Sequence, residues 1–184
     1  MKTFFILSLP RSRTAWLANF LTYENSFCFH EGLLHVGTPF QLEPLFRETH
    51  KPFVGNSDCG NVFFVDEIRD TLPEAKFVMI ERPLGEVLVE LRSLGDEWMD
   101  EEFVLKAYKH LQIIKHSVPH LAVNYDQLGE ENCEAIWEYC IGTPFDRTRW
   151  RMLDSIDMQI SLKKKLEQIR SAGDNVRVLA EGMH

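Results

Sequence analysis

Residues 4–17, with the sequence FFILSLPRSRTAWL, are the stretch that decides the fold of this chain. The apolar run predicts a buried strand that stops at Pro10, and a helical pattern begins at Thr14. A turn between a strand and a helix leaves the first backbone N–H groups of the helix unpaired, which suits an anion. The side chains suited to a phosphate or a sulfate are Arg11, Ser12, Arg13 and Thr14. We therefore predict an anion site here; the alternative is an ordinary turn with surface ion pairs.

The composition limits the class of protein. The chain has 184 residues, of which 45% are hydrophobic and 26% are charged. This composition suits one globular domain over residues 1–184. Within this domain, the pattern along the chain predicts a helical C-terminal part from about residue 130. The formal net charge of −8 disfavours general binding to nucleic acid or to an anionic membrane. The N-terminal apolar run is too short to span a bilayer and has no signal-segment pattern, so we expect a cytoplasmic protein.

The cysteines indicate neither a disulfide framework nor a metal site. Four cysteines are widely spaced, without a C-x-x-C pair, so we expect reduced and mostly buried thiols. Cys28 could join His30 and Glu31 around a metal ion, but no second cluster completes a tetrahedral set. We therefore expect no metal.

Strand-like runs alternate with helical patterns along the chain. The expected strands are residues 3–9, 26–29, 51–55, 76–80 and 120–124. The expected helices are residues 14–22, 39–48, 62–72, a helix opened by Pro83 at its first position, and residues 101–116, 132–140, 147–155 and 161–172. Nearly continuous apolar strands separated by helices predict a three-layer α/β/α fold with a central parallel sheet of about five strands.

Polar residues follow each predicted strand. They are Pro10–Thr14, His30 and Glu31, residues 56–58, Glu81 and Arg82, and Tyr125 and Asp126. The carboxyl ends of parallel strands share one edge of the sheet, and ligands bind beyond that edge. The sequence therefore predicts a single site. Asn56, Ser57 and Asp58 are predicted to bind substrate there, although such residues also form turns for structural reasons alone.

The first turn resembles the 5′-phosphosulfate loop of the sulfotransferase family. That loop usually has the order Pro, Lys or Arg, Ser, Gly, Thr, Thr or Ser, Trp, Leu. The matching residues are Pro10, Arg11, Ser12, Thr14, Trp16 and Leu17. Arg13 stands where glycine is usual, and Ala15 where a second hydroxyl is frequent. A position that needs a positive φ penalises a side chain, but Arg13 also adds a second cation.

Two later parts of the chain resemble the same family. Residues 76–88, KFVMIERPLGEVL, are similar to its 3′-phosphate segment, in which a strand ends in Arg-x-Pro or Arg-Arg-Pro and a helix with a serine follows. Residues 120–128, HLAVNYDQL, and 141–146, IGTPFD, are similar to its Tyr-Glu-Asp-Leu-like element and its Gly-x-Pro-Phe-like turn. The resemblance spans residues 1 to about 150.

The 3′-phosphate segment matches imperfectly. Arg82, just before the helix, is placed to meet a 3′-phosphate. Glu90 falls close to the place of the serine, and Ser93, one turn later, is expected to substitute for it. Glu81 stands where many members have a base. A carboxylate near a 3′-phosphate is repulsive, so Glu81 and Glu90 count against this donor.

The resemblance implies a P-loop nucleotide-hydrolase-like fold. It also implies that the protein transfers a sulfuryl group from 3′-phosphoadenosine 5′-phosphosulfate (PAPS) to an acceptor. The acceptor would be a hydroxyl or amine of a small molecule or peptide. The implied donor-binding residues are Arg11, Ser12, Arg13, Thr14, Ala15, Arg82 and Ser93. The implied general base is Glu31, with His30 next, because the acceptor must lose its proton as it attacks sulfur. Arg11 would stabilise charge on the bridging oxygen. The alternative for His30 and Glu31 is a purely structural strand end.

Two other functions stay open. One is a nucleotide-binding phosphotransferase of the same architecture, which the missing G-x-x-x-x-G-K-[ST] motif disfavours. The other is a non-catalytic interaction module of the sulfotransferase fold.

Overall fold

The computed structural model describes residues 1–94 and 100–156. The contacts divide the chain into two compact units, residues 1–146 and 147–184, and each is described by itself. In the second unit the described helix is α8 (Arg147–Asp154), which agrees with the helix expected there. The helix predicted at residues 161–172 lies outside the described residues. The expectation of a single domain over residues 1–184 stays a prediction.

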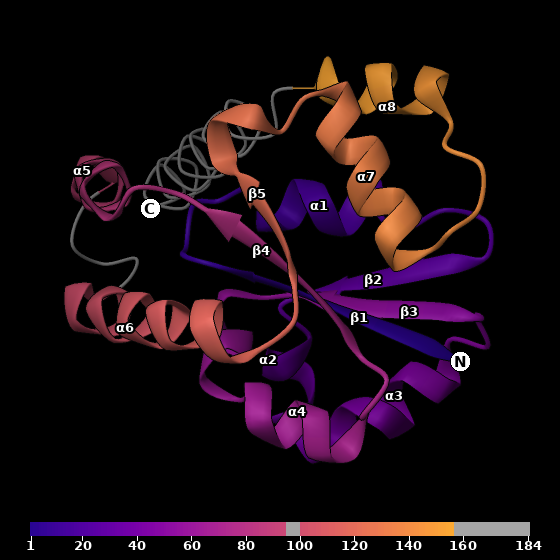
Figure 1. The fold of residues 1–184 in the computed structure, drawn as a ribbon, viewed down its shortest axis with the longest axis horizontal. Helices are drawn as coiled ribbons and strands as arrows, with labels where there is room; N and C mark the ends of the chain where they lie inside the picture. The colour runs from indigo at the N-terminus through magenta and orange to yellow at the C-terminus, as the bar shows by residue number, and fades with distance from the viewer. Residues whose placement is uncertain (95–99, 157–184) are drawn as a thin grey trace, which may run out of the picture. The chain divides into compact units, whose positions relative to one another are not determined.

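A five-stranded parallel sheet forms the centre of the first unit (Figure 1). Its strands are β1 (Lys2–Ser8), β2 (Ser26–His30), β3 (Phe53–Ser57), β4 (Lys76–Glu81) and β5 (Leu121–Asn124). They lie in the order β2-β3-β1-β4-β5, and each neighbouring pair is parallel. The predicted sheet is therefore confirmed, and four of its strands begin and end within one residue of the expected positions.

Helices cover both faces of this sheet. Those of the first unit are α1 (Thr14–Phe20), α2 (Gly32–Val36), η1 (Pro39–Gln41), α3 (Leu42–Glu48), η2 (Cys59–Phe63), α4 (Val65–Thr71), α5 (Leu84–Leu94), α6 (Glu101–Ser117), η3 (Tyr125–Gln127) and α7 (Glu130–Cys140). Helices α1 and α7 lie on one face, and α2, α3 and α4 lie on the other (Figure 1). The three predicted layers are therefore present.

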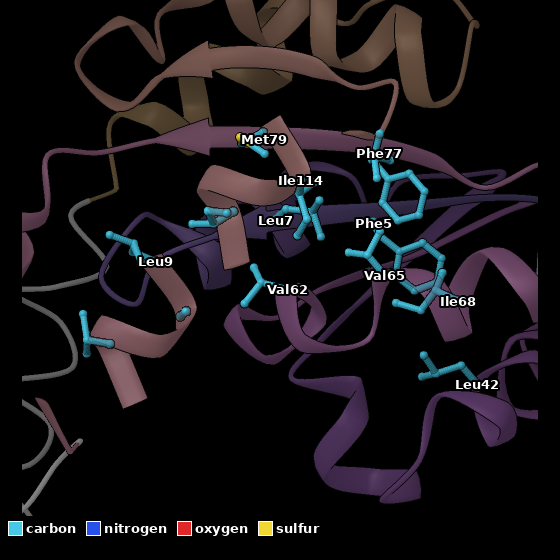
Figure 2. Close-up of a cluster of buried hydrophobic side chains, with 14 of the residues drawn as sticks. Phe5, Leu7, Leu9, Leu42, Val62, Val65, Ile68, Phe77, Met79 and Ile114 are labelled. Atoms are coloured by element: carbon cyan, nitrogen blue, oxygen red, sulfur yellow. The ribbon is translucent and has the colours of Figure 1, made fainter. Parts of the chain in front are cut away.

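Strand β1 is buried on both of its faces. Phe4, Phe5, Ile6 and Leu7 are all fully buried, which explains why the apolar run is continuous rather than alternating. On one face, Phe5 and Leu7 belong to the same hydrophobic cluster as Ile114 of α6 (Figure 2). Burial of this run fixes β1 at the middle of the sheet and so determines where the following loop emerges.

The order of the strands makes the junction between β1 and β4 a topological switch point. From β1 the chain passes over β3 to β2, whereas from β4 it moves the other way to β5. The connections after these two neighbouring strands thus lead apart. In open parallel sheets, ligands bind at such a point, beyond the carboxyl ends of the strands. This topology places the candidate site at the ends of β1 and β4.

Several element boundaries differ from the prediction. Strand β3 runs to Ser57 rather than ending at Gly55, because Asn56 and Ser57 continue the pairing with both neighbouring strands. Placing these two residues beyond the strand was therefore wrong. Pro83 precedes α5 instead of opening it, and its carbonyl accepts hydrogen bonds from the helix. Helix α2, which has five residues, was not predicted because it is too short to show a period.

Among residues 1–94 and 100–156, no helix is long and apolar enough to cross a membrane.

Candidate functional site

The loop between β1 and α1 contains two arginines in an unusual backbone conformation. Arg11 has a φ of 61° and Arg13 a φ of 60°, both in the left-handed region. Such a conformation costs a non-glycine residue roughly 1–3 kcal/mol and persists where the surroundings enforce it. Arg13 thus has the positive φ for which glycine is favoured. It is also the N-cap of α1, without a side-chain hydrogen bond to the helix.

A contact with β3 and contacts within the loop hold this loop in place. The Ser57 hydroxyl donates to the carbonyl of Thr14 at 2.8 Å, which ties the start of α1 to the end of β3. Ser12 is fully buried, and its hydroxyl donates to the carbonyl of Pro10 at 3.5 Å. Arg13 is exposed, with its guanidinium carbon 5.6 Å from the centroid of the Trp16 ring. The loop therefore presents Arg13 outward and Ser12 inward.

Three charged residues from different parts of the chain meet beside the loop, and we call Arg11, Arg82 and Glu90 the arginine cluster. Arg82, which follows β4, donates a hydrogen bond to the carbonyl of Arg11. Glu90 of α5 binds both arginines. Its Oε1 accepts from Arg11 Nε at 2.9 Å and lies 2.8 Å from Arg11 Nη2, while its Oε2 lies 2.7 Å from Arg82 Nη1. The fold thus joins the two segments that resemble phosphate-binding motifs.

Arg82 is the most enclosed member of the arginine cluster. Its side chain is 10% exposed, and its guanidinium carbon lies 4.1 Å from the centroid of the Tyr125 ring, a cation–π distance. Its Nε makes no hydrogen bond and lies 3.6 Å from an oxygen of Glu86. The sequence reasoning missed this role of Tyr125. The signal for it was an aromatic residue directly after β5, next to β4 in the sheet.

The two glutamates expected to oppose a 3′-phosphate lie in different surroundings. Glu81, at the end of β4, forms an ion pair with Lys115 of α6 at 2.7 Å. Glu90 instead neutralises the arginine cluster. Ser93, the expected substitute for the serine, donates its hydroxyl to the carbonyl of Glu90 at 2.6 Å and is exposed. Of these two glutamates, Glu90 is therefore the one that contacts Arg11 and Arg82, which were predicted to bind phosphate.

The two candidate bases lie at the end of β2. His30 Nε2 is 3.3 Å from the hydroxyl of Thr14 and 3.8 Å from Oε1 of Glu31. Glu31 precedes α2 with a φ of 57°, again in the left-handed region. His30 therefore contacts the predicted anion loop and Glu31 lies beside His30, and the choice of base stays a prediction.

A second polar group, which we call the asparagine cluster, consists of Asn56 and Asn61. The Asn56 side chain accepts from the backbone N–H of Gly32 at 2.8 Å and donates to the Asn61 side chain at 2.8 Å. Asn61 donates to the carbonyls of Ile6 and Asn56, each at 3.1 Å. Both asparagines are fully buried. This cluster connects β1, β3, η2 and α2 through internal hydrogen bonds.

Asp58 caps two neighbouring turns. Its carboxylate accepts from the backbone N–H of Gly60 at 2.7 Å and from that of Leu33 at 3.3 Å, and the residue is buried. Asn56, Ser57 and Asp58 thus all have internal hydrogen-bond partners. Their predicted role in binding substrate stays a prediction. Asn61 was missed, since nothing in the local sequence distinguishes it from an ordinary turn residue.

The cysteines behave as expected from the sequence. All four carry thiols, and Cys28, Cys133 and Cys140 are buried. Burial raises the pKa of Cys59 to about 12, and the charges of Asp58 and Glu31 add to the effect. Within residues 1–94 and 100–156, no three His, Cys, Asp or Glu side chains gather as a metal ion would require.

No protein-family model matches the sequence, and no curated protein matches it significantly. Among solved structures, the tunicamycin resistance protein of Deinococcus radiodurans is similar with a TM-score of 0.51 and 16% identity, covering 74% of this chain and 93% of that chain. A gluconokinase from Sinorhizobium meliloti 1021 matches with a TM-score of 0.47 and 12% identity, and the match covers 77% of this chain and 90% of that chain. The first likeness agrees with the predicted P-loop nucleotide-hydrolase-like fold and shows the fold alone.

Proposed function

We propose that this chain is a transferase that moves a sulfuryl group from PAPS to a hydroxyl or amine of a small molecule or peptide. The observation that carries the proposal is the hydrogen bond from Arg82 to the carbonyl of Arg11. It joins, beyond the ends of β1 and β4, two segments that each resemble half of the donor site of a sulfotransferase. The first half would hold the 5′-phosphosulfate and the second the 3′-phosphate of one donor.

The chemistry requires a cationic loop and a base on the acceptor side. Arg11, Arg13 and Thr14 surround the start of α1, where the backbone N–H groups favour an anion. The acceptor oxygen or nitrogen attacks sulfur while the bond from sulfur to the bridging phosphate oxygen breaks. Glu31 or His30 takes the proton of the acceptor, and Arg11 stabilises the charge left on the bridging oxygen.

A second candidate function is phosphoryl transfer from a nucleotide without a 3′-phosphate, such as ATP. The observation that favours it is the ion pair between Glu90 and Arg82, because the residue proposed for the 3′-phosphate already has an anionic partner. A glutamate at this position is repulsive toward a second anion. The two candidates therefore differ in whether the 3′-phosphate contributes to binding.

Calorimetry with adenosine 3′,5′-bisphosphate and with Mg·ATP separates these functions. We expect the bisphosphate to bind and, at a concentration of about 100 times Kd, to stabilise the protein by about 2.7 kcal/mol. Arg13→Ala should weaken this binding by about tenfold, as loss of a charge-assisted contact does. Arg47→Ala is the matched control, because Arg47 is an exposed arginine that pairs with Glu43 on α3.

The result distinguishes three cases. Binding of Mg·ATP alone would support the phosphotransferase, and binding of neither ligand would support the non-catalytic module. If the bisphosphate binds, turnover in Glu31→Gln and His30→Ala identifies the base. We expect Glu31→Gln to reduce turnover far more than donor affinity; loss of turnover in His30→Ala alone would assign the base to His30.

A further inference from the structure

Glu90 occupies the part of Arg11 that is best suited to an oxyanion. Its carboxylate faces both Nε and Nη2 of Arg11, the edge with which a guanidinium forms two parallel hydrogen bonds to a carboxylate or phosphate. The same carboxylate contacts Nη1 of Arg82 at 2.7 Å. One side chain of α5 thus pairs with both arginines.

The need for an anion at this point follows from the charges and their burial. Arg11 is 25% exposed and Arg82 is 10% exposed, and Arg82 donates to the backbone of Arg11. Two guanidiniums held so close repel each other unless a negative charge lies between them. Glu90, itself 21% exposed, supplies that charge. Glu86 contributes less, since it is 49% exposed and approaches only Arg82 Nε, at 3.6 Å.

We propose that Glu90 is a specificity-determining residue that stands in for the anions of the donor, so that a nucleotide must displace its carboxylate from Arg82, the residue proposed for the 3′-phosphate, and from Arg11, the residue proposed for the 5′-phosphosulfate. This inference rests on the proposed function, because it concerns the proposed nucleotide site at the ends of β1 and β4. Glu90 lowers the affinity for every anion at the arginine cluster, and it lowers the affinity for a 3′-phosphate most of all.

The position of Glu90 supports displacement rather than a fixed structural role. Glu90 lies near the middle of α5, so its side chain can be shortened without removing a residue that begins or ends the helix. The Nε of Arg82 lacks a hydrogen-bond partner even though the side chain is nine-tenths buried. Glu90 therefore leaves this guanidinium incompletely satisfied, as expected for a partner that an incoming oxyanion replaces.

The test measures binding of three probes by calorimetry: adenosine 3′,5′-bisphosphate, adenosine 5′-phosphate and pyrophosphate. The variants are Glu90→Gln, which removes the charge and keeps the shape, and Glu90→Ser, which removes the reach across to the arginines. We expect Glu90→Gln to bind the bisphosphate about tenfold more tightly than the natural protein and the 5′-phosphate less than about threefold more tightly, because like charges in contact are costly. Glu86→Gln is the matched control, with a change below about twofold.

The unliganded variants provide a second readout. Loss of the counter-anion should lower the melting temperature of Glu90→Gln while its affinity for the bisphosphate rises. Should Glu90→Gln fail to fold, Glu90→Ser decides by the same measurement. Weaker binding in the folded variants would show that Glu90 orients the arginines for the ligand, and this would overturn the proposal.

Failure of the proposed function gives a different pattern. One outcome is that neither adenosine nucleotide binds to any variant, while pyrophosphate binds more tightly to the Glu90 variants than to the natural protein. This outcome would support displacement of Glu90 by an anion and would contradict PAPS as the donor. If the nucleotides bind equally well to the natural protein and to the Glu90 variants, the donor site stands and the role of Glu90 is overturned. Absence of binding of all three probes to every variant overturns both.

Discussion

The asparagine cluster and the arginine cluster lie at the same carboxyl edge of the sheet, but different groups satisfy them. Asn56 and Asn61 are fully buried and bond to each other and to backbone atoms of neighbouring strands and turns. Arg11 and Arg82 both pair with a partly exposed carboxylate from α5. The first cluster uses neutral partners within the core, and the second uses a charged partner at the surface.

This difference is the one that we expect between a structural cluster and the proposed ligand site. A ligand could engage the asparagines only by breaking hydrogen bonds inside the core, and each unsatisfied buried group costs about 1–3 kcal/mol. At the arginine cluster, a phosphate could replace Glu90 with little loss, since one oxyanion exchanges for another. Stability should therefore depend most on the first cluster, and ligand affinity on the second.

The largest expected effect on stability comes from the asparagine cluster. Asn61→Ala removes the donor to the Ile6 and Asn56 carbonyls and leaves buried polar groups without partners. We expect a loss of about 2–3 kcal/mol in the free energy of unfolding, measured by urea denaturation. Asn124→Ala is the control, because the side chain of the exposed Asn124 donates to the Gln127 side chain and not to a buried group. Equal losses for the two variants would contradict the comparison.

A smaller effect on stability is expected at the arginine cluster. Arg82→Lys keeps the charge but loses the planar contact with Tyr125 and the shared bonds to Glu90 and Arg11. We expect about 1 kcal/mol less stability, and about tenfold weaker binding of adenosine 3′,5′-bisphosphate. Arg47→Lys serves as the control for both measurements. A stability loss as large as that of Asn61→Ala, with unchanged binding, would make Arg82 a structural residue.

The smallest effect near neutral pH concerns Cys59, which follows Asp58 at the border of the asparagine cluster. Its pKa is raised from 9.0 to about 12, mainly by burial, so the folded protein holds this proton more tightly than the unfolded chain. The contribution of Cys59 to stability is therefore fully present below about pH 9 and is lost as the pH rises toward 12. As the pH rises from 8 to 9.5, the melting temperature of Cys59→Ser should fall slightly less than that of the natural protein. A steeper fall in this variant would contradict the assignment.

The sequence predicted most of the fold because the sheet is buried on both faces. The apolar runs of β1 and β4 are continuous, and their burial leaves no other arrangement than a covered parallel sheet. The end of β3 could not be predicted, since Asn56 and Ser57 are polar and extend the strand only because neighbours satisfy them. Helix α2 was missed because five residues show no periodicity.

The proposed anion loop could be predicted because its parts are neighbours along the chain. A strand, a cationic turn and a helix follow each other within residues 4–17, so the sequence alone indicated the anion loop. Tyr125 could be placed at the correct edge of the sheet, but its contact with Arg82 could not. Glu90 was recognised from the sequence as unfavourable to a phosphate, whereas its two arginine partners became evident only from the fold.

By itself, the sequence determined how strands and helices alternate along the chain, because this depends on burial. It also determined the cationic turn after β1, because this depends on neighbouring residues. The tertiary structure decided which charges meet. Arg11 and Arg82 are 71 residues apart, and Arg11 and Glu90 are 79 residues apart. Ion pairs depend on distance in space, and the strand order that brings β1 beside β4 sets that distance. The loop after β1 thus belongs to a site whose charge balance is completed by a carboxylate from α5.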